Sequence, residues 1–111
     1  MADELSPENQ RRIDIILSGQ AALVGSVGAN LRVVQVTWKE TKIHLYFIYD
    51  GKFTNEDEEE CNKVAERMQR DFSNTNIEVS HLQVDYPQKL PTPLEKQYTW
   101  LYARREAPLG N

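Results

Sequence analysis

Two neighbouring stretches near the middle of the chain have the pattern of β-strands. Residues Leu31–Trp38 and residues 43–49 are rich in β-branched and aromatic side chains, and polar residues 39–42 separate them. This pattern predicts two strands paired as an antiparallel hairpin, because a short polar connection favours that pairing. Both faces of the second strand are largely apolar, which indicates a strand in the interior of its sheet.

A helical pattern follows this hairpin. The sequence of residues 54–60 has the features of a helix start: Asn55 and Glu58 have the spacing of a capping box, and Thr54 is a second candidate for the N-cap. Beyond it, apolar residues recur at intervals of three or four positions, which predicts an amphipathic helix with one buried stripe. The stripe consists of Cys61, Val64, Ala65, Met68 and Phe72.

A second helical pattern lies near the start of the chain. Ser6 and Pro7 are typical of a helix start, because a serine side chain accepts hydrogen bonds from free N–H groups and proline suits the first helical position. Apolar residues then follow helical spacing in residues 13–17. The pattern predicts a helix that ends near residue 18 or continues towards residue 25.

The last third of the chain contains two further strand-like patterns around a proline-rich segment. In residues 77–86 the apolar positions change parity, and a β-bulge near residues 80–81 is the simplest structure that accommodates the change. The prolines in residues 87–93 predict an irregular, extended loop. Residues 98–104 alternate again and predict the last strand.

The predicted order of elements is therefore α-β-β-α-β-β. A chain of 111 residues is expected to form a single domain. Two hairpins joined through a helix predict an α+β fold, with a mainly antiparallel four-stranded sheet and two helices packed on one face. We expect residues 1–5 and 107–111 to form frayed tails at the ends of this domain.

The charge and composition of the chain exclude several classes of protein. The formal net charge of −4 argues against nucleic-acid binding, since that function normally requires an excess of basic residues. The first residues lack the basic and apolar pattern of a secretory signal, and no apolar run approaches the ~20 residues of a membrane-spanning helix. One cysteine cannot form an internal disulfide. We therefore expect a cytoplasmic protein that does not associate with membranes.

The largest charge cluster is a run of five acidic residues at the start of the predicted second helix, which we call the acidic helix start. Carboxylates in a first helical turn are favoured by the helix dipole, so a solvated, stabilising role accounts for part of the run. The functional interpretation is a surface that attracts and binds a basic protein. The acidic helix start consists of Glu56, Asp57, Glu58, Glu59 and Glu60.

Aromatic residues in the last predicted strand are a second candidate for a binding surface. Tyr98, Trp100 and Tyr102 are expected on one face of the strand, and Arg104 follows them. Alternate aromatic residues on a strand usually pack in a core. Tryptophan, tyrosine and arginine also dominate the energetics of protein interfaces, so Trp100, Tyr102 and Arg104 are candidate contacts with a protein partner.

Histidine and cysteine often act in catalysis or bind metals, but in this sequence both are expected to have structural positions. His44 and His81 have no cysteine or glutamate at the spacing of metal ligands, although a weak pH-responsive or metal site would be conceivable if they were solvent-facing neighbours on adjacent strands. Cys61 lies in the apolar stripe and is expected to pack in the core. The sequence also lacks phosphate-binding, hydrolase and zinc-binding motifs, so we predict no catalytic residue, metal or cofactor.

Three short motifs resemble a family of small, stand-alone, uncharacterised bacterial proteins. They are NLRxVxV at residues 30–36, LYFxYDG at residues 45–51 and WLYxRRE at residues 100–106. The resemblance covers most of residues 20–106 and implies a shared fold. Some proteins of this kind act as immunity proteins or as adaptors, so it also implies a protein-binding role.

These observations support three hypotheses about function. The first is a non-enzymatic, immunity-type or adaptor-type module that binds a basic protein through the acidic helix start. The second is a small-ligand-binding protein or small enzyme with a pocket between the sheet and the helices, containing His44, Tyr46 or His81. The third is a homodimer formed by pairing of edge strands.

Overall fold

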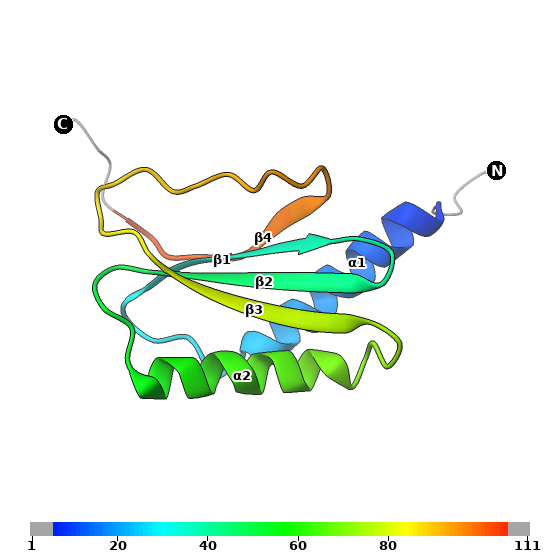
Figure 1. Cartoon of the computed structure of the whole chain (residues 1–111), viewed down its shortest axis with the longest axis horizontal. Helices are drawn as coiled ribbons and strands as arrows, with labels where there is room; N and C mark the ends of the chain where they lie inside the picture. The colour runs from blue at the N-terminus through cyan, green and yellow to red at the C-terminus, as the bar shows by residue number, and fades with distance from the viewer. Residues whose placement is uncertain (1–5, 107–111) are drawn as a thin grey trace.

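A computed structural model describes residues 6–106 of the chain, and the expected frayed tails at residues 1–5 and 107–111 lie outside the described residues. The order of the elements is the predicted α-β-β-α-β-β (Figure 1). The elements are α1 (Pro7–Leu23), β1 (Leu31–Trp38), β2 (Lys42–Tyr49), α2 (Asn55–Gln69), β3 (Asn76–Gln83) and β4 (Tyr98–Ala103).

The four strands form one sheet in the order β3-β2-β1-β4. β1 pairs antiparallel with both β2 and β4, whereas β2 pairs parallel with β3. This confirms the α+β fold, the mainly antiparallel sheet and the interior position of β2. The expected second hairpin is wrong, since β3 and β4 lie at opposite edges. The physical reason is that α2 returns the chain to the end of the sheet where β2 begins, so β3 runs in the same direction as β2.

The expected bulge in the third strand is also wrong. β3 follows β2 in unbroken register from the pair Lys42↔Asn76 to the pair Tyr49↔Gln83. Leu82 therefore faces away from the helices, where the proline-rich segment provides an apolar surface beside it. The change of parity in the sequence reflects apolar contacts on both faces of one regular strand.

The two helices begin at side-chain caps. Ser6 accepts a hydrogen bond from the Asn9 N–H, and Pro7 occupies the first helical turn of α1, as predicted. α2 starts with a capping box in which the Thr54 hydroxyl accepts from the Asp57 N–H at 3.1 Å and the Asp57 carboxylate accepts from the Thr54 N–H at 2.8 Å. Thr54 and Asp57 thus replace the expected pair of Asn55 and Glu58, because the extended backbone needed at an N-cap occurs at Thr54.

Both faces of the central strands are buried, each by a different part of the chain. On one face, both helices pack against the sheet, and the predicted stripe of α2 contributes Cys61, Val64 and Met68 to this core. On the other face, residues 84–97 pass across the sheet between β3 and β4 (Figure 1). The Gln35 side chain donates a 2.7 Å hydrogen bond to the carbonyl of Pro91 in this segment.

Gly19 brings α1 close to β4. A Cβ atom at this position would lie 2.5 Å from Cδ1 of Leu101, which is nearly fully buried in the core. A side chain at position 19 would therefore require the Leu101 side chain to move within the core.

The substitution Gly19→Ala should therefore destabilise the fold. We expect the free energy of unfolding to fall by about 1–2 kcal/mol, because overpacking costs more than the ~1 kcal/mol gained from helix propensity. Urea denaturation measures the change. In a Leu101→Ala background the clash is absent and the same substitution should be neutral or stabilising; an equal loss in both backgrounds would contradict the steric explanation.

Candidate protein-binding surface

The five carboxylates of the acidic helix start have different surroundings. Asp57 belongs to the capping box and also accepts a hydrogen bond from the Asn30 side chain at 3.4 Å. Glu60 accepts from the Ser26 hydroxyl at 2.9 Å and pairs with Lys63 at 3.0 Å, and these two contacts hold the pKa of Glu60 below its ordinary value. Two of the five therefore stabilise the start of α2 and its contact with the α1–β1 connection.

The other three carboxylates are available to solvent. Glu56, Glu58 and Glu59 are exposed, and none forms an ion pair within residues 6–106. A surface groove of about 450 Å³ runs between residues 25–28 and the helix start. Of the acidic helix start, Glu56, Asp57, Glu59 and Glu60 line this groove, whereas Glu58 does not. The structure thus presents a concave acidic surface and a further carboxylate beside it.

The aromatic residues of β4 do not form one continuous surface. The pairing of β1 with β4 shifts register, so that Val34 lies opposite Tyr102 while Gln35 lies opposite Trp100. Tyr102 consequently packs against the helix-side core together with Leu101, whereas Trp100 lies on the other face with 45% of its surface exposed. The expectation of one shared face is wrong for Tyr102, because the irregular pairing reverses the alternation of side chains.

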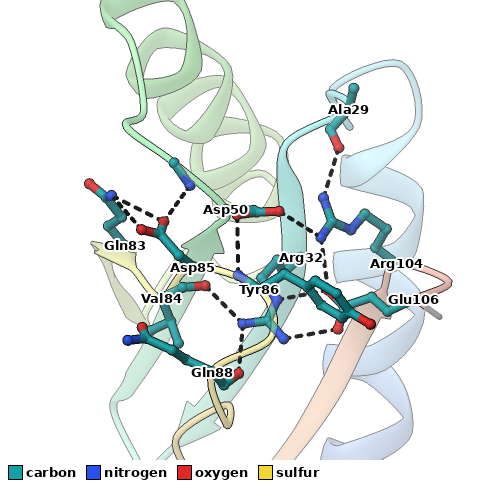
Figure 2. A network of polar contacts seen from close by, with 11 residues as sticks. Ala29, Arg32, Asp50, Gln83, Val84, Asp85, Tyr86, Gln88, Arg104 and Glu106 are labelled. Carbon is teal, nitrogen blue, oxygen red and sulfur yellow. Dashed lines mark hydrogen bonds and ion pairs between the residues drawn. The ribbon is translucent and has the colours of Figure 1, made fainter. Parts of the chain in front are cut away.

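A network of polar contacts closes one end of the sheet (Figure 2). Arg32, which is only 4% exposed, makes a bidentate pair with Glu106 through contacts of 2.7 and 2.9 Å. Its remaining terminal nitrogen donates to the carbonyls of Val84 and Gln88 at 2.8 and 2.9 Å. Each guanidinium nitrogen therefore has a partner, as a buried cation requires.

Arg104 is engaged in the same network. Its guanidinium pairs with Asp50 at 3.1 Å and with Glu106 at 3.0 Å, and Asp50 also accepts from the Tyr86 N–H at 3.2 Å (Figure 2). The hydrogen bond from Arg32 lowers the pKa of Glu106, and that from Arg104 lowers the pKa of Asp50. Both carboxylates are thus held in their charged form.

The network explains the three motifs recognised in the sequence. Each motif contributes at least one charged residue, although the motifs are far apart along the chain. The contacts join the start of β1, the end of β2 and the end of β4 to residues 84–88. The sequence patterns did not predict this junction, although the charged residues within the three motifs could have indicated it. The residues are Arg32, Asp50, Arg104 and Glu106.

The two histidines lie on opposite faces of the sheet. His44 stacks on Tyr46 with ring centres 4.1 Å apart and contacts the Ser80 hydroxyl at 2.7 Å, and burial lowers its pKa. His81 lies opposite Phe47 and stacks on Phe53 at 5.1 Å, on the helix side. The arrangement needed for a shared pH-responsive or metal site is absent from residues 6–106, where no cluster of metal-ligating residues occurs.

The other two residues considered for chemistry are Cys61 and Tyr46. Cys61 is buried in the core beside the Tyr49 hydroxyl at 3.0 Å, and burial raises the pKa of its thiol to about 11. A thiol of this kind is a poor nucleophile near neutral pH. Tyr46 lines a hollow beneath residues 91–95, on the face away from the helices, so it does not share a site with His81.

Loss of the buried ion pair should strongly reduce stability. Glu106→Ala is expected to lower the free energy of unfolding by about 2–4 kcal/mol, because Arg32 then remains buried without its carboxylate. Urea denaturation at neutral pH measures this. Arg105→Ala, which removes the exposed neighbour, should change stability by less than about 0.5 kcal/mol.

The network should also make stability depend on pH. The pKa values of Glu106 and Asp50 are lower in the folded protein than the ordinary values of 4.5 and 3.8, so their contribution is complete well above these values. It is lost as the pH falls through the lower, folded-state pKa values. Urea denaturation at a series of acidic pH values should show stability declining below about pH 4.5, with a shallower decline for Glu106→Ala. Equal slopes would show that Glu106 is not a source of the dependence.

Comparison with known proteins identifies the family. No helix within residues 6–106 combines the length and apolar character that crossing a membrane requires. No curated protein matched the chain. Residues 12–106, which include all four strands and α2, match the MafI2 immunity protein family. This match supports the resemblance to a small bacterial family, and an immunity protein family implies a toxin as the protein partner. The chain belongs to the MafI2 immunity protein family and is an immunity-type protein-binding module.

Proposed function

We propose that this immunity-type module binds its toxin through the acidic helix start and that the toxin presents a basic surface there. The observation that carries the proposal is the exposure of Glu56, Glu58 and Glu59 without an ion pair in residues 6–106. Carboxylates that the fold does not use internally can attract a basic partner at long range and pair with it on contact. The net charge of −4 acts in the same direction.

The residues of β4 contribute unequally to this proposal. Arg104 pairs with Asp50 and Glu106, and Tyr102 packs against the core. Trp100 alone of the three offers a large exposed aromatic surface, on the sheet face away from the helices. We therefore assign the main toxin contact to the acidic helix start and a peripheral contact to Trp100.

We place this activity in the cytoplasm. Cys61 is a free thiol packed in the core, and a chain with one cysteine suits a reducing compartment. Neutralisation there would require rapid capture of the toxin before it acts. Electrostatic attraction serves that requirement, because it increases the association rate.

The proposal predicts slower association when the charge of the helix start is reversed. The double variant Glu58→Lys/Glu59→Lys should bind the purified cognate toxin domain about tenfold more slowly at low ionic strength, with a smaller difference at high salt. Stopped-flow or surface-based kinetics measure the rates.

A matched variant controls for net charge. Glu8→Lys/Glu40→Lys makes the same change at exposed positions in the first turn of α1 and in the β1–β2 turn, at the opposite end of the molecule from the start of α2 (Figure 1). It should slow association much less than the test variant. Equal rates for the two double variants would exclude the acidic helix start as the docking surface.

A further inference from the structure

β3 has one edge that is not paired with another strand of the sheet. It is the end strand in the order β3-β2-β1-β4. The N–H groups of Asn76 and Val84 donate to Thr41 and Tyr49 on the β2 side. Since the direction of N–H groups alternates along a strand, those of the residues between them alternate between β2 and the free edge. The residues directed to the free edge are Ile77, Val79, His81 and Gln83.

This edge lacks the features that usually prevent a strand from pairing with another chain. β3 has eight residues, contains no proline and keeps a regular register with β2 throughout. β4, at the other edge, has six residues and pairs irregularly with β1. Natural edge strands are commonly short, bulged or interrupted by proline, because an open edge readily accepts a further strand. β3 is therefore the better template for strand addition.

A groove follows the free edge on the helix side, and a hollow that extends over β2 and β1 reaches Leu82 on the opposite side. On the helix side, α2 runs beside β3 and the two elements border a groove of about 470 Å³ (Figure 1). On the opposite side, Leu82 is 39% exposed and borders the hollow of about 250 Å³ beneath residues 91–95. Alternate side chains of an added strand would point into these two hollows. The helix-side groove is lined by Asn62, Ala65, Glu66, Gln69, Ile77 and Val79.

The charge along the helix-side groove is negative. Glu58 and Glu66 lie four residues before and after Asn62 on α2, so the three share one row of the helix surface. Both glutamates are exposed and neither forms an ion pair within the described chain. The groove therefore suits an extended segment with an apolar residue facing Ala65 and basic residues facing the two carboxylates.

We infer that the free edge of β3 binds an extended, basic segment of the toxin as a fifth strand of the sheet. The inference rests on the proposed function and names the structural element of the partner that the surface accepts. Backbone hydrogen bonds to the outward-facing residues of β3 supply the affinity, and the two hollows select the alternate side chains. The acidic helix start adjoins this groove, because Glu58 lies one helical turn before Asn62, which lines it.

Amide-resolved hydrogen exchange tests the inference directly. On saturation with the purified cognate toxin domain, the N–H groups of the outward-facing residues Val79, His81 and Gln83 should exchange at least about tenfold more slowly. The alternate residues Ser80 and Leu82 already donate to β2 and should change little. Slower exchange at these outward-facing amides indicates that they become hydrogen-bonded in the complex, and the alternate amides, which are already bonded to β2, serve as internal controls.

A proline substitution provides a second test. Gln83→Pro removes an N–H group at the free edge while leaving the hydrogen bonds between β3 and β2 in place. It should weaken toxin binding about tenfold relative to Gln83→Ala, which loses the same side chain but keeps the N–H group. Thermal unfolding of both variants checks that the fold is retained.

The outcomes separate this inference from the proposed function. If the toxin binds, charge reversal slows it and the β3 amides remain unprotected, strand addition is overturned and docking at the acidic helix start stands. If no complex forms, both are overturned. If the same amides become protected without toxin as the protein concentration rises, the occupant is a second copy of this chain, and the assignment to the toxin is overturned.

Discussion

The pair of Arg32 and Glu106 joins parts of the chain that are distant in the sequence. Arg32 begins the central hairpin and Glu106 follows the last strand, yet their side chains make a bidentate contact in which Arg32 is 4% exposed and Glu106 is 19% exposed. The same guanidinium binds two carbonyls of the segment that leaves β3. One cation thus fixes where β4 ends and where residues 84–97 begin their path across the sheet. A buried charge requires such complete pairing, so the geometry is strictly constrained.

This junction determines which surfaces remain for a partner. Because residues 84–97 cover one face of the sheet and two helices cover the other, neither face of the central strands is open to binding. The surfaces that remain include the outer side of α2, the groove beside its start, the edge of β3 and the exposed side chain of Trp100. The groove at the start of α2 is lined by four carboxylates, and the groove between α2 and β3 is lined by one, Glu66.

The fold was more predictable than the site. Local patterns were sufficient for the order of elements, the interior position of β2 and the buried stripe of α2, because each depends on periodicity within one element. The pairing between strands that are distant in the sequence could not be predicted from these local patterns. The parallel pairing of β3 and the irregular pairing of β4 depend on the path of the connections, which local alternation does not contain. The candidate Arg104 illustrates the consequence, since its pairing with Asp50 became evident only in three dimensions.

The sequence by itself determined that this protein is an α+β domain with an acidic helix start, because hydrophobic periodicity and charge are local properties of the chain. Only the tertiary structure determined which of the five carboxylates form hydrogen bonds within the fold, which line the groove and which are exposed to solvent. It also decided that the quoted motifs build a junction and that β3 retains a free edge. The physical reason is that hydrogen bonds and ion pairs depend on distance and direction in space, which positions along a chain do not specify.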